Sequence, residues 1–229
     1  MDPEIFDDQY HGCEGKMEKI ITGGLLDKEL KINPHFKSAW ESSKSMWYNG
    51  VKAKVKHTLP HGFKDENGIA IVAYTGFIYG QFNEAARAVG KSLKNYMNNF
   101  HFKSFHYYLT GALRKLTKGC NKRMVYRGVK NVHFMPPKKG NELQFGQITS
   151  TSYNINVALN FGKDSFFYIR TCYGVPITTF SQYPNEEEVL LRGNEVFTVK
   201  SFNQLTHTFL LDSNHKKHSF FNCAYFKGQ

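Results

Sequence analysis

The chain has 229 residues, enough for one large domain or two small lobes, and its 41% hydrophobic and 15% aromatic content excludes a disordered protein. Its net charge of +11 would allow binding to a polyanion, but the basic residues are dispersed. There is no Arg-rich helix, RNP-type motif or zinc-finger spacing, so nucleic-acid recognition is not favoured. No apolar run reaches the roughly 20 residues of a membrane span, and the acidic start lacks the apolar core of a signal peptide.

The first 120 residues show the spacing of amphipathic helices. Pro34 suits a first helical turn, and the stretch that follows it predicts a helix over 34–47. One face of this helix carries Phe36, Trp40, Ser43 and Trp47.

Further helices are expected in the same half. Residues 65–68 (DENG) predict a break before a buried helix in GIAIVAYTGFIYG at 68–80, and FNEAARAV at 82–89 is rich in helix formers. The clearest helix is FHFKSFHYYLTGALRKL at 100–116, with Gly119 as its stop. Its apolar stripe consists of Phe102, Phe105, Leu109, Ala112, Leu113 and Leu116.

From residue 122 onward the pattern changes to the period of two that is typical of strands. The expected strand regions are MVYRGV, ELQFGQITSTS, SFFYIRTCYGVPITTF, EEEVLLRGNEVFTVKSF, THTFLLDS and SFFNCAYF. Residues 192–194 (RGN) predict a hairpin turn. Helices followed by strands predict an α+β fold and not alternating βαβ units.

The cysteine spacing bears on the compartment of the protein. Cys13, Cys120, Cys172 and Cys223 include no CxxC pair, so a zinc site is not expected. Four widely spaced cysteines suit two disulfides in an oxidising compartment, with three possible pairings. The alternative is four buried reduced thiols in a cytosolic protein.

An arginine lies among apolar residues in the first predicted strand. Period two places Val125, Arg127 and Val129 on one face, so Arg127 either reaches to solvent at an edge or points into a polar cleft. A guanidinium is the preferred group for gripping phosphate oxygens. The neighbouring Gly128 allows another group to approach the backbone closely.

Two polar clusters follow. Hydroxyls end the stretch FGQITSTS at 145–152, before a helix or loop in YNINVALNFG, and either cap the chain or orient a catalytic carboxylate. Glu186, Glu187 and Glu188 begin the next strand, and period two predicts that Glu186 and Glu188 share a face. Such a pair resists simultaneous ionisation unless a cation lies between its members. A solvated charge run is the alternative.

An arginine, a strand-end serine and Glu-x-Glu in this order resemble the Arg-Ser-Glu class of mono-ADP-ribosyltransferases. More closely, the chain resembles the vertebrate ecto-ADP-ribosyltransferases. The motifs that carry this resemblance are FDDQYHGC at 6–13, AYTG at 73–76, FHYYLTGAL at 105–113, VYRG at 125–128, FGQITSTS at 145–152, TCYGV at 171–175 and EEEVLLRGNEVF at 186–197.

The resemblance implies one domain over 1–229, with a helical N-terminal lobe (1–120) packed on a β-sandwich NAD-binding core (121–229). It also implies the disulfides Cys13–Cys223 and Cys120–Cys172 and an extracellular protein, secreted or lipid-anchored.

The resemblance further implies the roles of single residues. Arg127 holds the NAD diphosphate or the adjacent ribose, Ser150 positions the catalytic Glu188, and Glu186 marks arginine as the acceptor. Gly128 offers backbone hydrogen bonds to the nicotinamide amide, and Phe161 stacks on its ring. Tyr126 and Gln147 complete the expected NAD contacts, Tyr183 contributes to acceptor recognition, and no metal is expected.

The implied activity is transfer of ADP-ribose from NAD to arginine side chains of proteins, with release of nicotinamide. The ribose becomes positively charged as nicotinamide leaves, and a carboxylate stabilises that charge. Two alternatives are an enzyme of the same fold that mainly hydrolyses NAD and a catalytically silent surface binding protein.

Overall fold

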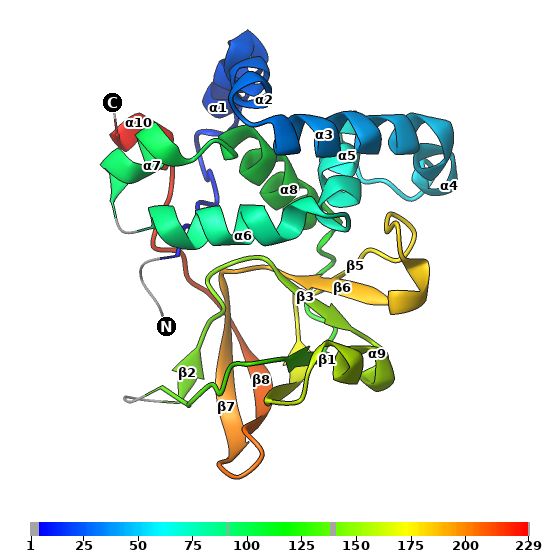
Figure 1. The fold of residues 1–229 in the computed structure, drawn as a ribbon, viewed down its shortest axis with the longest axis vertical. Helices are drawn as coiled ribbons and strands as arrows, with labels where there is room; N and C mark the ends of the chain where they lie inside the picture. Colours follow the sequence, from blue (N-terminus) through cyan, green and yellow to red (C-terminus); the bar gives the residue numbers. More distant parts are fainter. Residues whose placement is uncertain (1–4, 91, 138–140, 229) are drawn as a thin grey trace. The chain divides into compact units, whose positions relative to one another are not determined.

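The computed structural model describes residues 5–90, 92–137 and 141–228 (Figure 1). The chain forms two compact units. One unit is mainly helical and contains the described residues of 5–116, Thr179–Gln182 and residues 219–228. The other contains Thr117–Thr178 and Tyr183–His218, and holds the strands.

The helical unit begins with short helices that lead into the long helix α3 (Pro34–Met46). Asn33 caps α3, because its side chain accepts a hydrogen bond of 3.0 Å from the main-chain N–H of Phe36, and Pro34 fills the first turn. The predicted face is buried, which confirms the helix expected here. The elements before and after α3 are α1 (Glu14–Ile20), η1 (Ile21–Leu25), α2 (Leu26–Ile32), η2 (Trp47–Val51) and α4 (Lys52–Val55).

The break predicted at residues 65–68 is wrong. Helix α5 (Asp65–Tyr74) begins there, and the Asp65 carboxylate accepts a hydrogen bond of 2.9 Å from the Trp47 indole nitrogen. Gly68 lies inside this helix, and the position requires glycine because a Cβ there would come within 2.3 Å of the Trp47 ring. The single buried helix expected over 68–80 is also wrong, because α5 ends at Tyr74 and α6 (Ile78–Val89) follows.

Helix α8 (Lys103–Leu116), which follows α7 (Leu93–Asn99), confirms the expected helix over most of its length. It begins where the buried Glu29 carboxylate accepts hydrogen bonds from the main-chain N–H groups of Lys103 (2.7 Å) and Ser104 (2.9 Å). A carboxylate at this end satisfies amide groups that have no partner within the helix. Every residue of the predicted stripe except Leu116 is buried.

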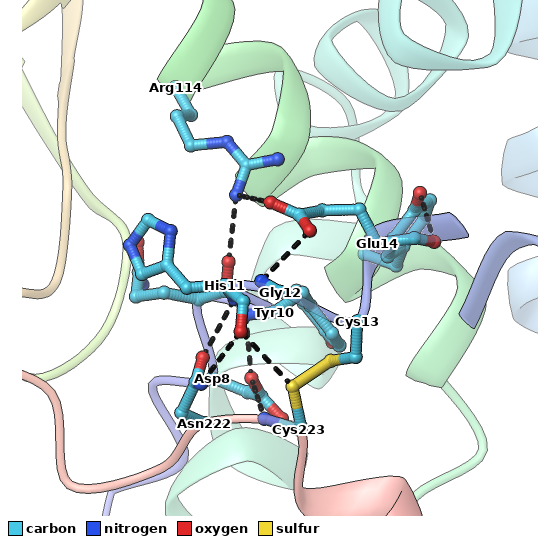
Figure 2. A network of polar contacts seen from close by, with 11 residues as sticks. Asp8, Tyr10, His11, Gly12, Cys13, Glu14, Arg114, Asn222 and Cys223 are labelled. Carbon is cyan, nitrogen blue, oxygen red and sulfur yellow. Dashed lines mark hydrogen bonds and ion pairs between the residues drawn. A yellow bond between two sulfur atoms is a disulfide. The ribbon is translucent and has the colours of Figure 1, made fainter. Parts of the chain in front are cut away.

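The strand predicted for SFFNCAYF is wrong, because this segment is a loop followed by helix α10 (Ala224–Lys227) in the helical unit. Asp7 accepts hydrogen bonds from the main-chain N–H groups of Phe220 and Phe221, and Asp8 does the same for Cys223 and Ala224. The Cys13–Cys223 disulfide and the Arg114–Glu14 ion pair (3.1 Å) lie in the same network (Figure 2). These contacts join residues 7–13 to residues 220–224 within the helical unit.

The other unit is an eight-stranded sheet in the order β2-β7-β8-β4-β1-β3-β6-β5 among the described residues. Its strands are β1 (Arg123–Val129), β2 (Glu142–Leu143), β3 (Thr149–Ser152), β4 (Ser165–Thr171), β5 (Val175–Pro176), β6 (Glu188–Leu191), β7 (Glu195–Asn203) and β8 (Thr208–Lys217), and α9 (Ile155–Phe161) follows β3. Strands β1 and β3 share only the pair Tyr126 and Ser152, so two groups of strands meet at a narrow junction. Most helices precede the strands along the chain and lie in the other unit, which confirms the α+β class.

The predicted hairpin at residues 192–194 is a turn, but it joins strands that do not pair. Strand β6 pairs with β3 and β5, whereas β7 pairs with β2 and β8. The core beneath the sheet contains Val125, Phe167, Ile169, Val189, Leu191, Phe197, Phe209 and Leu211. Among the described residues, no helix is long and apolar enough to cross a membrane.

Candidate active site

Arg127 lies on the same face of β1 as the buried core residue Val125, as period two predicts. Its side chain is half-buried, and Nη1 donates a hydrogen bond of 2.7 Å to the main-chain oxygen of Ser150. The guanidinium thus connects β1 to β3, two strands that are joined by a single residue pair of the sheet. Tyr126 lies on the opposite face, against the ring of Tyr168.

Gly128 makes room for helix α9. A Cβ at this position would lie 2.2 Å from the main-chain oxygen of Ala158 and 2.3 Å from that of Gly162. Gly162 has φ +149, and a Cβ there would lie 2.3 Å from the main-chain nitrogen of Lys130. The close approach predicted for Gly128 is therefore made by the end of α9, where Phe161 is 55% exposed.

The register between β3 and β6 brings Ser150 and Glu188 to one face. Ser152 is opposite Glu188 and Ser150 is opposite Leu190, so the two serines and Glu188 share a side of the sheet. The Ser150 side chain hydrogen-bonds to the Glu188 carboxyl group. The Ser150 hydroxyl and the Glu188 carboxyl group therefore lie on one side of the sheet, within hydrogen-bonding reach of each other.

Glu188 is a buried acid, 7% exposed at the start of β6. Burial raises its pKa to about 7, because a charged carboxylate loses hydration there. The hydrogen bond from Ser150 acts in the opposite direction, and the nearby charge of Glu186 adds to the increase. Burial also raises the pKa of Glu186 above its ordinary value.

Glu186 and Glu188 come close together by a route that period two does not predict. Glu186 ends the 3-10 turn η3 (Pro184–Glu186), and Glu187 has left-handed backbone angles (φ 46, ψ 44) before the strand begins. Glu187 is exposed, and its carboxylate accepts a hydrogen bond of 3.3 Å from the Asn154 amide. The expectation of three strand residues is wrong, but the central acid does point elsewhere.

Ser152 is a residue of this site that the sequence did not single out. Its hydroxyl donates a hydrogen bond of 2.6 Å to the main-chain oxygen of Glu186 and accepts one of 2.9 Å from the main-chain N–H of Asn154. The available signal was its place two residues after Ser150, which puts both serines on one face of a strand.

The remaining predicted residues surround this group less directly. The main-chain oxygen of Gln147 accepts a hydrogen bond of 3.1 Å from the Thr149 hydroxyl. Tyr183 is 54% exposed and directly precedes η3. Its main-chain oxygen accepts a hydrogen bond of 3.0 Å from the Glu186 N–H, which closes the turn. The Arg127 guanidinium therefore reaches the main chain of Ser150, and Ser150 and Glu186 act on Glu188. Tyr126 is opposite Ser152, which is opposite Glu188, so the Tyr126 side chain shares the Glu188 side of the sheet. Gln147, Phe161 and Tyr183 lie on the flanking segments.

This arrangement can hold an anion at the guanidinium and a developing cation at the two carboxylates. Because the pKa of Glu188 is about 7, its carboxyl group can be ionised at physiological pH. The buried carboxylate is then poorly hydrated, which strengthens its attraction for a positive charge. A ligand that carries a diphosphate and a sugar with transient positive charge fits both demands.

Comparisons with known proteins also indicate an ADP-ribosyltransferase, which binds a ligand of this kind. The sequence model of the family "NAD:arginine ADP-ribosyltransferase" matches residues 1–219. The rat ecto-ADP-ribosyltransferase 5 (Rattus norvegicus) is 40% identical over 99% of this chain and 76% of its own length. The mouse T-cell ecto-ADP-ribosyltransferase 2 (Mus musculus) is 43% identical over 98% of this chain and 76% of its own length.

Solved structures agree with these sequence relatives. The crystal structure of the eukaryotic mono-ADP-ribosyltransferase ART2.2 superposes with a TM-score of 0.86 at 41% identity, over 97% of this chain and 96% of that chain. A variant of ART2.2 in complex with NAD superposes with a TM-score of 0.85 at 40% identity, over the same shares of the two chains.

Proposed function

Because the chain belongs to the NAD:arginine ADP-ribosyltransferase family, we propose that it transfers ADP-ribose from NAD to arginine side chains of acceptor proteins. NAD is the donor substrate of the family and ADP-ribosyl transfer is its reaction. We also propose that arginine is the acceptor side chain and that single residues have the roles given below. The match of one family model to residues 1–219 supports treating both units as a single ADP-ribosyltransferase domain.

The observation that carries the proposal is the buried Glu188, hydrogen-bonded by Ser150 and within electrostatic reach of Glu186. In the transfer, the bond between the nicotinamide nitrogen and the ribose C1 atom breaks, and its electron pair leaves with neutral nicotinamide. Ionised Glu188 stabilises the positive charge that develops on the ribose and hydrogen-bonds to a ribose hydroxyl.

The acceptor guanidinium has a pKa above about 12 and is a poor nucleophile while it keeps its proton. Glu186 aligns the guanidinium and accepts a proton as the new bond to the ribose forms. The half-buried Glu186 at the end of η3 supports this role, since it is open to an incoming side chain. The exposed Tyr183 at the start of the same turn contributes to acceptor recognition.

The other groups bind NAD. Arg127 grips the diphosphate or the adjacent ribose, with Tyr126 and Gln147 as further contacts. Gly128 uses its backbone groups for the nicotinamide amide, and the exposed ring of Phe161 stacks on nicotinamide. We assign no metal to this reaction, because the proposed carboxylates and guanidinium supply the required charges.

The experiment compares Glu186→Gln and Glu188→Gln with wild type, using labelled NAD with and without agmatine, an arginine analogue. Glu188→Gln should lower both transfer and NAD hydrolysis by roughly 10² to 10³, the effect of losing one electrostatic stabiliser. Glu186→Gln should keep hydrolysis and lower transfer to agmatine. Glu187→Gln is the matched control, because Glu187 is exposed and glutamine keeps an acceptor for Asn154.

Equal losses of both activities in Glu186→Gln and Glu188→Gln would contradict the division of roles. Nicotinamide release without ADP-ribosyl-agmatine in the wild type would identify an NAD glycohydrolase. Absence of any NAD turnover would identify a silent binding protein of the same fold.

The protein is expected to act outside the cell, secreted or anchored by a lipid. Both disulfides suit an oxidising compartment, and the relatives are named ecto-enzymes. Intact cells that express the full-length protein should modify an added acceptor with external NAD. A phospholipase that cleaves lipid anchors should release the activity only if the protein is anchored.

A further inference from the structure

A short segment between β5 and η3 belongs to the helical unit. The chain leaves the strand-containing unit after Thr178, contributes the anchor segment Thr179–Gln182 to the helical unit and returns with Tyr183, directly before η3. Glu186 follows Gln182 by only four residues. We propose that Gln182, held by the helical unit, is a positioning residue for Glu186 and so controls transfer to the acceptor. This inference rests on the proposed function.

Gln182 is bonded to the C-terminal end of α5 by its main chain and by its side chain. Its N–H donates a hydrogen bond of 3.2 Å to Thr75 Oγ1, and its Nε2 donates one of 3.0 Å to the main-chain oxygen of Val72. The Thr75 hydroxyl donates a hydrogen bond of 2.8 Å to the same oxygen. Val72 is among the last four residues of α5, whose carbonyl groups need partners outside the regular helix. These three hydrogen bonds form a closed ring that fixes Gln182.

Gly76 makes room for the Gln182 amide. A Cβ at this position would lie 2.7 Å from Gln182 Nε2, whereas the next nearest atom, the main-chain oxygen of Ala73, would be 3.4 Å away. A larger side chain would therefore displace the end of the Gln182 side chain and leave the helix in place. The motif AYTG at 73–76 thus has a physical role, because its threonine and its glycine form the seat of Gln182.

Phe180 holds the anchor segment at a second point. Its side chain is buried, and its ring centroid lies 6.2 Å from that of Trp47, in a stacked arrangement, and 6.2 Å from that of Phe63. An aromatic ring packed among other rings fixes the chain by its shape. The ring of Phe180 and the polar contacts of Gln182 together determine where the chain leaves the helical unit.

Glu186 depends on this anchor more than Glu188 does. Glu188 lies in β6, which is paired with β3 on one side and β5 on the other. Glu186 lies before the strand, and its N–H donates a hydrogen bond of 3.0 Å to the main-chain oxygen of Tyr183. The turn therefore begins at the residue that follows Gln182, and Pro184 restricts its backbone. A shift of Gln182 is passed to Glu186 through this short turn.

The position of Glu186 decides between two outcomes of the same bond cleavage. In transfer, the acceptor nitrogen bonds to ribose C1 as nicotinamide leaves with the electron pair, and Glu186 takes a proton from the guanidinium. In hydrolysis, water forms the bond to C1 and releases its proton to solvent. A displaced Glu186 no longer aligns the acceptor, so loosening the anchor segment should lower transfer and spare hydrolysis.

The test measures agmatine transfer and NAD hydrolysis with labelled NAD on the same sample of the full chain. The variants are Gln182→Ala, Thr75→Val and Gly76→Ala, each of which removes or displaces a contact of the ring at Gln182. The KM for agmatine should rise and the ratio of transfer to hydrolysis should fall by about 2- to 10-fold, the effect of one hydrogen bond. The KM for NAD should stay unchanged.

Three further variants separate positioning from general stability. Thr75→Ser keeps the hydroxyl and should keep the ratio of the wild type. Thr58→Val is the matched control, because the Thr58 hydroxyl donates a hydrogen bond of 2.9 Å to the carbonyl three residues earlier, as Thr75 does, but at the end of α4. Thr179→Ala changes an exposed side chain of the anchor segment itself. Both Thr58→Val and Thr179→Ala should leave the ratio unchanged.

An unchanged ratio in Gln182→Ala and Gly76→Ala, while the wild type modifies agmatine, would overturn this inference and leave the proposed function standing. An equal fall of transfer and hydrolysis in these variants would also overturn it, since that result indicates a loss of fold. A wild type that forms no ADP-ribosyl-agmatine would contradict the proposed function and, with it, the role of Gln182.

Discussion

The hydroxyl of Ser152 donates a hydrogen bond of 2.6 Å to the main-chain oxygen of Glu186 and so connects the end of β3 to the turn η3. The same hydroxyl accepts a hydrogen bond from the N–H of Asn154, the cap of α9. One small side chain therefore sets the position of the acid that we assign to the acceptor.

We predict that Ser152→Ala lowers the ratio of transfer to hydrolysis, because η3 loses the contact that holds Glu186 in place. The stability loss should be about 1 kcal/mol, the usual net contribution of one hydrogen bond. Transfer to agmatine and NAD hydrolysis measured on the same sample give the ratio.

Thr151→Val is the matched control for this prediction. The Thr151 hydroxyl donates a hydrogen bond of 2.7 Å to the main-chain oxygen of Val189, on the other face of the same strand. Its removal should cost similar stability and leave the ratio unchanged. An equal change of the ratio in both variants would assign the effect to strand stability and not to the Glu186 turn.

The pKa of Glu188, raised to about 7 by burial, predicts a pH dependence of activity. The ionised form is needed to stabilise the cationic ribose, so kcat/KM for NAD should rise with pH through about 7 and level off above it. Ser150→Ala should move the midpoint to higher pH, since the hydrogen bond from Ser150 lowers the Glu188 pKa. A midpoint unaffected by both Ser150→Ala and Glu186→Gln would show that another group controls the profile.

The same raised pKa affects the free energy of unfolding. Between the ordinary glutamate pKa of 4.5 and the folded value of about 7, the folded chain keeps a proton that the unfolded chain has lost. Stability therefore falls as pH rises through this window. Glu188→Gln should be more stable than wild type at pH 8, by at most about 3 kcal/mol, and the difference should vanish near pH 4. Urea unfolding at both pH values measures it, and a pH-independent difference would contradict it.

The sequence predicted elements that depend on local patterns. The buried face of α3 follows directly from the spacing of Phe36 and Trp40, and β1 follows from the alternation around Arg127. The motifs also singled out Ser150 and Glu188, which the register of β3 and β6 places on one side of the sheet. These features are encoded within a few residues of each other or within a strongly characteristic motif.

The wrong predictions concern segments whose secondary structure or strand pairing is determined by residues far away in the sequence. The SFFNCAYF segment has a strand-like composition, but its N–H groups bond to the carboxylates of Asp7 and Asp8, more than 200 residues earlier in the sequence. The residues 192–194 form a turn, yet β6 and β7 find partners elsewhere in the sheet. Glu186 lies in η3 before the strand, and its main-chain oxygen accepts a hydrogen bond from Ser152, which is 34 residues earlier in the sequence. Local propensity cannot predict such partners.

Arg127→Lys should weaken NAD binding about 10-fold or more, the value of one charge-assisted hydrogen bond. Lysine keeps the charge but cannot bond to the Ser150 oxygen and to a phosphate with a planar fork. Equilibrium titration with NAD measures the change. An NAD affinity equal to that of the wild type would refute the phosphate-binding role of Arg127.

Gly128→Ala should destabilise the fold and disturb the NAD site together, because the added Cβ would lie 2.2 Å from the Ala158 oxygen and 2.3 Å from the Gly162 oxygen. Both atoms belong to the backbone, so relief requires α9 to move away from β1. The expected cost is about 1–3 kcal/mol, or several degrees in Tm. Gly80→Ala is the control, since its Cβ would meet nothing within 4 Å in the exposed first turn of α6, and alanine there should raise the stability slightly. If the two variants unfold at the same temperature, the packing of α9 on Gly128 does not constrain this strand.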